Sequence, residues 1–198
     1  MILPIYTYGS AVLRKVAQPI QKEYSKLDEL IKNMYETMYH AEGIGLAATQ
    51  IGLSIRLLII DLAPFNEDNP EIGNFKKTMI NPTIIEFDDE KVAGEEGCLS
   101  IPGIHENVLR AKKIKINYFD QDFNEYTEVY YDFIARVVQH EYDHLEGNLF
   151  TDKVSPIRRQ LLKSKITSII KGKIETSYKI KSALSSSAIG LQKSKKNI

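Results

Sequence analysis

The segment Gln139-His140-Glu141-Tyr142-Asp143-His144 is the one around which the rest of this chain is organised. Its two histidines are four residues apart, and on a helix this spacing places both imidazoles on one face, where they can share a metal ion. The surrounding sequence favours a helix, because apolar residues recur between Asp132, which can cap its start, and Gly147, which can end it. The alternative is a buried helix whose histidines only satisfy local hydrogen bonds.

One further residue can complete the metal site, and another can act on the water that the metal activates. A catalytic site needs a third protein ligand and an open position. Cys98 is the candidate, because the glycines around it allow its loop to approach the helix closely. The alternative for Cys98 is an inert buried thiol. Glu141 directly follows a predicted ligand, so we expect it to lie near the metal and to act as a general base on a water that the metal activates.

Composition predicts an ordinary soluble protein with one catalytic domain. The chain has 198 residues, 43% of them hydrophobic and 26% charged, and its formal net charge is zero. A zero net charge offers no overall attraction to nucleic acid or to an acidic membrane, so we predict neither sequence-specific nucleic-acid binding nor membrane association. The N-terminus lacks the pattern of a secretion signal and no apolar run could span a membrane, which predicts a cytoplasmic protein.

The hydrophobic pattern predicts an α+β fold. A helix is expected from Ser25 to His40, where the exposed His40 suits the helix dipole, and another from Pro156 to Gly172. The residues between 63 and 76 are rich in turn formers and predict a surface loop. Residues 1–172 are predicted to form the catalytic domain, and residues 173–198 a basic, Ser- and Lys-rich mobile tail. Strands are expected at 56–61, 78–87, 114–119 and 126–131, the last two as an antiparallel pair.

A run of small residues from Gly43 to Gly52 permits a close approach of backbone to another group. Its spacing is not that of a dinucleotide-binding or phosphate-binding loop. Taken by itself, the run is typical of a tight turn packed against a strand. On the residues alone, we therefore expect a packing turn and assign the run no function.

Three segments together resemble the bacterial-type, metal-dependent peptide deformylases. They occur in the order and with the kind of spacing found in that family, and the similarity extends over roughly residues 1–170. The resemblance implies antiparallel sheets wrapped around the metal-binding helix, with an N-terminal and a C-terminal helix. The segments are Gly43-Ile44-Gly45-Leu46-Ala47-Ala48-Thr49-Gln50, Glu95-Glu96-Gly97-Cys98-Leu99-Ser100 and Gln139-His140-Glu141-Tyr142-Asp143-His144.

The resemblance also implies roles for individual residues. Glu141 would be the acid and base, and the Gln50 amide and the Leu99 backbone N–H would stabilise the oxyanion. One metal ion per chain is implied, with Fe²⁺ as the physiological ion and Zn²⁺, Ni²⁺ or Co²⁺ able to substitute, although the donor set by itself suits zinc. The implied metal ligands are Cys98, His140 and His144, and the implied substrate-binding residues are Ile44, Gly45, Gly97, Phe133, Arg136 and Val137.

The reaction implied is removal of the formyl group from the N-terminal formylmethionine of nascent polypeptides, with release of formate. Association with the ribosome is a possible further property. Asp143 and Gln139 are expected to orient the ligands or the helix, and Asp143 could pair with Arg110. One alternative is a zincin-type metallopeptidase, for which only His40 and His105 remain as a third histidine ligand. The other is a deformylase-like binding protein without turnover, which the presence of every expected catalytic residue argues against.

Overall fold

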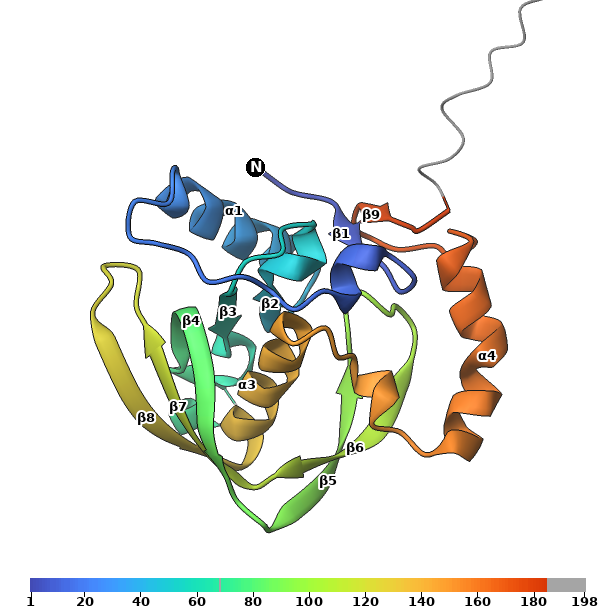
Figure 1. The fold of residues 1–198 in the computed structure, drawn as a ribbon. Coiled ribbons are helices and arrows are strands. Elements are labelled where there is room, and N and C mark those ends of the chain that lie inside the picture. The colour runs from blue at the N-terminus through green and yellow to red at the C-terminus, as the bar shows by residue number, and fades with distance from the viewer. Residues whose placement is uncertain (68, 185–198) are drawn as a thin grey trace, which may run out of the picture.

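The computed structural model describes residues 1–67 and 69–184, which form an α+β fold around one central helix (Figure 1). A five-stranded antiparallel sheet lies on one side of this helix, and a two-stranded hairpin lies on the other. The predicted arrangement of sheets around a metal-binding helix is therefore confirmed. The helices of this part of the chain are α1 (Leu27–His40), α2 (Pro70–Gly73), α3 (Asp132–Leu145) and α4 (Pro156–Ile170).

The larger sheet has the strand order β2-β3-β4-β7-β8, and each neighbouring pair is antiparallel. The edge strand β2 therefore has one side of its backbone without a partner in the sheet. In β3 both faces are buried, because Leu58 and Ile60 pack with α3 and Leu57 and Ile59 pack with α1. All four predicted strands are present in this sheet. Its strands are β2 (Gly45–Ala47), β3 (Leu57–Asp61), β4 (Lys76–Phe87), β7 (Lys113–Phe119) and β8 (Glu125–Tyr131).

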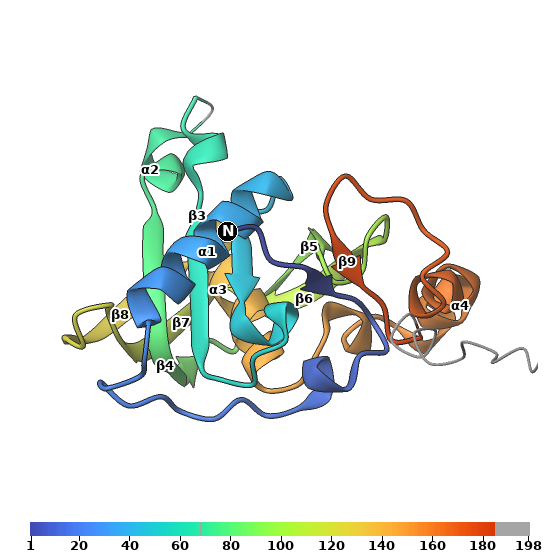
Figure 2. The same cartoon turned by 90° about the horizontal axis from the view of Figure 1, so that it is seen from above.

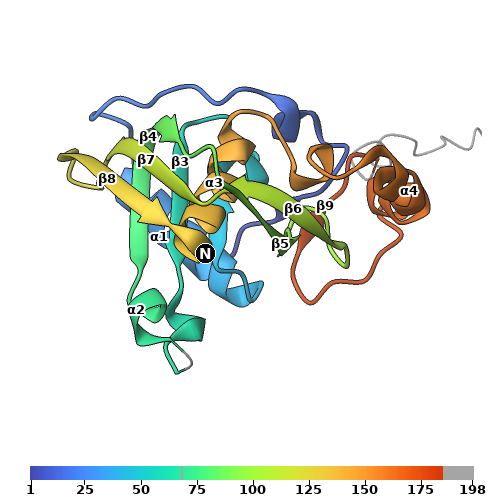
Figure 3. The same cartoon turned by 90° about the horizontal axis from the view of Figure 1, so that it is seen from below.

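The hairpin of β5 (Lys91–Gly97) and β6 (His105–Ala111) was not predicted as strands from the sequence. In β6 the inward positions are Glu106, Val108 and Arg110, whereas the apolar Leu109 points outward and is 61% exposed. The usual alternation of apolar and polar residues is therefore absent, because this face buries charged side chains. The hairpin lies across α3 from the larger sheet, as the view from below shows (Figure 3).

Two details of the helical predictions need correction. Asp132 does not cap α3: it is the first residue of the helix, with φ of 47°, and the capping position is held by Tyr131, which makes no side-chain cap hydrogen bond. The segment expected as a loop between residues 63 and 76 contains a 3₁₀ turn at Ala63–Phe65 and the short helix α2, whose Asn69 caps it by accepting a hydrogen bond from the Ile72 N–H. The expected helix ending at His40 is confirmed, and His40 is exposed.

The chain after α4 returns to the domain, which corrects part of the tail prediction. Strand β9 (Ile180–Lys181) pairs in parallel with the N-terminal strand β1 (Ile5–Tyr6), as the view from above shows (Figure 2). The predicted boundary at residue 172 is therefore not the end of the folded region, while the tail predicted for residues 185–198 lies outside the described residues. Among the residues the structure describes, no helix combines the length and apolar character needed to cross a membrane.

Candidate metal centre

The structure brings the three predicted metal ligands together. His140 and His144 lie one turn apart on α3, and Cys98 directly follows the end of β5. The Cys98 Sγ atom is 3.3 Å from Nε2 of His144, and one donor atom from each of the three side chains lies within 4.8 Å of the others. The alternative reading of Cys98 as an isolated buried thiol is thus excluded by its position beside the two imidazoles.

These side chains fit a transition-metal ion. One thiol and two imidazoles form a donor set of the kind found in catalytic zinc-type sites, which retain an open position for water or substrate. Nδ1 of His144 is buried and has no hydrogen-bond partner within residues 1–67 and 69–184. Burial, followed by the charge of His140, holds the pKa of His144 well below its usual value.

Glu96 is the residue that sequence reasoning missed. Its carboxylate is buried and accepts a hydrogen bond from Nδ1 of His140 at 2.9 Å, which leaves Nε2 of that ring for the metal. Arg110 donates to both oxygens of Glu96 at 2.8 Å, and Arg136 donates to one of them at 2.8 Å. Burial by itself raises the pKa of Glu96, but the hydrogen bonds from Arg110 and His140 lower it to about 2, so the group is a permanent anion.

Glu96 could be found from its spacing to Cys98 only once this segment is known to be a strand, which its apolar pattern does not indicate. It lies two residues before Cys98 at the end of β5, and residues two apart in a strand point to the same face of the sheet. The expected pairing of Asp143 with Arg110 is confirmed as a buried ion pair. Gln139 orients the helix as expected, because its side-chain amide accepts from the Ala111 N–H at 3.2 Å and donates to the Ala111 carbonyl at 2.8 Å.

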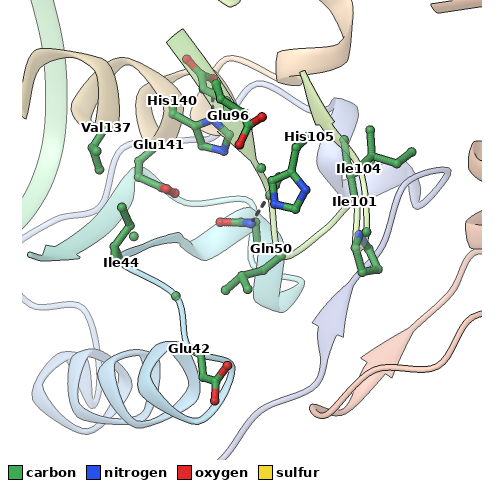
Figure 4. A pocket seen from close by; sticks show the side chains of 18 of the residues that line it. Glu42, Ile44, Gln50, Glu96, Ile101, Ile104, His105, Val137, His140 and Glu141 are labelled. Carbon is green, nitrogen blue, oxygen red and sulfur yellow. Dashed lines mark hydrogen bonds and ion pairs between the residues drawn. The ribbon is translucent and has the colours of Figure 1, made fainter. Parts of the chain in front are cut away.

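Glu141 extends from α3 into a cavity of about 580 Å³ beside the triad (Figure 4). Its Oε2 atom is buried and has no hydrogen-bond partner among the residues that the structure describes, and burial raises the pKa of this carboxyl to about 7. The β2 backbone passes so close that a Cβ atom at Gly45 would lie 2.4 Å from Oε1 of Glu141. The small residue at this position is therefore required by the close approach of strand and carboxylate.

Gln50 lies on the opposite side of the cavity from α3, in a 3₁₀ turn at Ala48–Ile51. Its Oε1 atom accepts a hydrogen bond from the Ala47 N–H at 2.8 Å, which fixes the orientation of the amide. Its Nε2 atom is 3.5 Å from Cys98 Sγ and 3.2 Å from the Ser100 hydroxyl oxygen. The donor end of this amide is thus held beside the metal ligands.

All six predicted substrate-binding residues border the same cavity. Ile44 and Val137 lie together at one end, and Ile101, Ile104 and His105, which were not predicted, lie at the other (Figure 4). Arg136 is held more deeply than expected, because its guanidinium also donates to the carbonyl oxygens of β5 and β6. The predicted lining residues are Ile44, Gly45, Gly97, Phe133, Arg136 and Val137.

Comparison with known proteins identifies the family to which this site belongs. The model of the polypeptide deformylase family matches residues 2–160. The chain belongs to the polypeptide deformylase family. A peptide deformylase of Christiangramia forsetii is 50% identical over 188 residues, which cover 91% of this chain and 96% of that protein. One from Flavobacterium psychrophilum is also 50% identical, over 91% of this chain and 97% of its own length.

Solved structures of deformylases share the fold. The crystal structure of the Thermotoga maritima peptide deformylase matches with a TM-score of 0.71 and 41% identity, over 79% of this chain and 99% of that one. The Legionella pneumophila structure matches with a TM-score of 0.76 and 34% identity, over 87% and 98%. The predicted deformylase activity, removal of an N-formyl group, is confirmed by family membership together with the Cys-His-His triad. The zincin alternative is wrong, because Cys98 stands where a histidine or glutamate would be required.

Proposed function

We propose that this chain hydrolyses the formyl group of peptides that begin with formylmethionine, and that Glu141 is its acid and base. The observation that carries the proposal is the buried, unpartnered carboxylate oxygen of Glu141 in the same cavity as Cys98 and His140. A carboxylate with a pKa near neutrality can both accept and donate a proton at physiological pH.

Cys98, His140 and His144 would hold one metal ion per chain. When bound, the ion would lower the pKa of a coordinated water and polarise the formyl carbonyl. We propose Fe²⁺ as the physiological ion, with Zn²⁺, Ni²⁺ or Co²⁺ able to substitute, because thiolate and imidazole donors suit all four. The support for iron is the family resemblance, whereas the donor set alone is equally suited to zinc.

The chain's own groups would move the proton and stabilise the developing charge. Glu141 takes the proton of the attacking water and later transfers it to the leaving nitrogen, so that formate and a free amine are released. The Gln50 amide, which Ala47 fixes, and the backbone N–H of Leu99 would donate hydrogen bonds to the oxyanion. Such donors typically contribute about 3 to 4 kcal/mol each to transition-state stabilisation.

The edge of β2 would bind the peptide backbone. Because this strand has no partner on its outer side in the sheet, Gly45 and the N–H of the preceding Ile44 can hydrogen-bond an extended peptide as an added strand, while the Ile44 carbonyl accepts from the Asp61 N–H of β3 at 3.0 Å. Gly97 of β5 would form the opposite side of the channel, since it also lines the cavity. Phe133 and Val137 of α3, with the stem of Arg136, would then surround the methionine side chain.

We further propose that the enzyme acts in the cytoplasm on nascent chains and associates with ribosomes. The support is electrostatic: Lys163, Lys165 and Lys171 on and after α4 are exposed, and none of them has an ion pair among the described residues. Exposed lysines bind phosphate backbones in a salt-dependent manner. Co-sedimentation with ribosomes that is lost on replacing these lysines with glutamate would support the association, and unchanged sedimentation would refute it.

The proposed activity is tested with formyl-Met-Ala-Ser and protein purified and loaded with Fe²⁺ in the absence of oxygen. Formate release from this peptide should be rapid, whereas acetate release from acetyl-Met-Ala-Ser should be undetectable. Absence of formate release from the iron, nickel and cobalt forms alike would overturn the proposal.

A further inference from the structure

A segment after α4 takes part in the cleft although it lies outside the part of the chain matched by the family model. Residues 173–181, here the C-terminal strap, follow the family match, which ends at residue 160. The strap is tied to the N-terminal strand by hydrogen bonds from the Ile5 N–H to the Lys179 carbonyl at 2.9 Å and from the Thr7 N–H to the Lys181 carbonyl at 3.1 Å. Its path between α4 and β9 is visible from above (Figure 2).

The strap forms part of the cavity wall. Residues 175–178 line the same cavity as Cys98 and Glu141. Tyr178 is partly buried and packs against the cluster that also contacts Leu99. The Tyr178 hydroxyl donates a hydrogen bond of 2.8 Å to the Leu99 carbonyl oxygen, across 79 residues of sequence. A segment from the end of the chain is therefore bonded directly to the residue that follows a metal ligand.

The turn that contains Leu99 is held from two sides. Within the turn, the Ile101 N–H donates to the Cys98 carbonyl at 2.8 Å. From the N-terminal region, the Tyr8 N–H donates to the Ser100 carbonyl at 2.8 Å. The remaining carbonyl, that of Leu99, is the one that Tyr178 engages. With this bond in place, the peptide units on both sides of Leu99 have little freedom to rotate.

We propose that Tyr178 is a positioning residue for the Leu99 turn, and that the strap is a wall of the cleft which contacts substrate residues beyond the methionine. This inference rests on the proposed function, in which the Leu99 N–H serves the oxyanion. Tyr178 would act through Leu99 and not on the reacting atoms. The aromatic ring of Tyr178 would limit the width of the cleft beyond the metal centre. A tripeptide substrate extends into this part of the cleft, whereas a single formylated residue does not.

Three variants of the full chain separate these roles. Tyr178→Phe removes the hydroxyl and retains the ring, whereas Tyr178→Ala removes both. Tyr35→Phe is a matched control, because the Tyr35 hydroxyl also donates to a backbone carbonyl, that of Lys77 at 3.0 Å, but lies outside the cavity. Each variant is assayed for kcat and KM on formylmethionine amide and formyl-Met-Ala-Ser, and for amide hydrogen exchange in residues 98–101.

Tyr178→Phe should lower kcat on both substrates by roughly threefold to tenfold with little change in KM, and should speed hydrogen exchange in residues 98–101. Tyr178→Ala should in addition raise KM for formyl-Met-Ala-Ser at least threefold while KM for formylmethionine amide stays unchanged. Tyr35→Phe should change none of these quantities. Values for Tyr178→Phe within twofold of the control, or an equal rise in KM for both substrates, would overturn the inference.

Failure of the proposed function gives a different result. In that case the parent protein itself would release no formate from either substrate. Hydrogen exchange in residues 98–101 and the affinity for the deformylated peptide Met-Ala-Ser, measured by calorimetry, need no turnover. Faster exchange and at least threefold weaker peptide binding in Tyr178→Ala would support the inference even then, and unchanged values would refute it.

Discussion

The Glu96 carboxylate of β5 and the His140 imidazole of α3 are joined by a 2.9 Å hydrogen bond between Oε2 and Nδ1. This bond fixes the ring orientation that directs Nε2 towards Cys98 and His144. The Glu96 carboxylate is itself held by ion pairs with Arg110 of β6 and Arg136 of α3. The hairpin therefore orients the metal-binding face of α3.

Glu96→Gln should weaken metal binding by about 10-fold to 100-fold, since groups that orient a metal-ligating histidine typically contribute that much. The neutral amide lacks the negative charge of the carboxylate, so it cannot replace the charged hydrogen bonds to His140 and to both arginines. The His140 ring therefore loses its fixed orientation. Metal affinity is measured by competition with a chromophoric chelator. Glu42→Gln, at the exposed rim of the same cavity, serves as the control and should bind metal as the parent does.

The stability conferred by Glu96 should depend on pH. Its pKa is about 2 in the folded protein, below the value of about 4.3 for an unfolded glutamate, so its contribution is fully present above pH 4.5. It is lost progressively as the pH falls towards 2. Urea unfolding with a chelator present should therefore show a difference between parent and Glu96→Gln that is large at pH 7 and smaller at pH 3. A difference independent of pH would contradict this assignment.

Glu141→Gln should retain the fold and the metal but lose most turnover. The amide has nearly the same shape but cannot accept and return a proton, and general acid–base groups typically contribute about 100-fold to 10,000-fold. The measurement is kcat with formyl-Met-Ala-Ser at equal metal content. Activity within a few fold of the parent would show that the base is another group.

Cys98→Ala should lose the metal and the activity together, since the two histidines alone supply only two ligands. Metal content is determined by elemental analysis after dialysis against a chelator, with the parent treated in the same way. If iron is the working metal, the parent should also lose activity in air, because Fe²⁺ and the thiolate are both oxidisable. Full metal content in Cys98→Ala would refute its role as a ligand.

The lining of the cavity predicts specificity for methionine. A hydrophobic pocket discriminates by roughly 1 to 3 kcal/mol per methylene, so kcat/KM should be more than about 10-fold higher for formyl-Met than for formyl-Ala peptides. Val137→Phe should reduce this preference by filling the end of the cavity where Ile44 and Val137 lie. Equal rates for the two peptides with the parent would mean that the methionine side chain binds elsewhere.

Much of this molecule could be predicted from the sequence because the signals are local. The spacing of His140 and His144 places them on one helical face, whatever the rest of the fold is. Strand β7 alternates between buried and partly exposed positions, as half-buried strands do, whereas in β8 only Tyr130 is buried. The lone Cys98 with its flanking glycines indicated the third ligand, which the structure places beside the two histidines. Resemblance of three short segments added Gln50 and Leu99, whose roles in the reaction stay predictions until the variants are measured.

The hairpin and the C-terminal strap were decided only by the tertiary structure. Charged residues on the inner face of β6 removed the apolar alternation by which strands are recognised, because their burial depends on partners far away in sequence. Residues 173–181 were predicted as tail because the apolar stripe of the last helix stops at Gly172. They are ordered by backbone hydrogen bonds to β1 and by the Tyr178 bond to Leu99, and composition contains no information about such bonds.

The sequence by itself determined the ligand types and the placement of the two histidines on a helix, and its resemblance to a known family determined the activity class. Tertiary structure decided that Cys98 reaches His144 across 46 residues, that Glu96 orients His140, and that a distant segment borders the cleft. The physical reason is range. Helical and strand periodicity act over a few residues. A metal site and its cavity require contacts between elements that are far apart in the sequence, and sequence separation does not tell which of these elements meet in space.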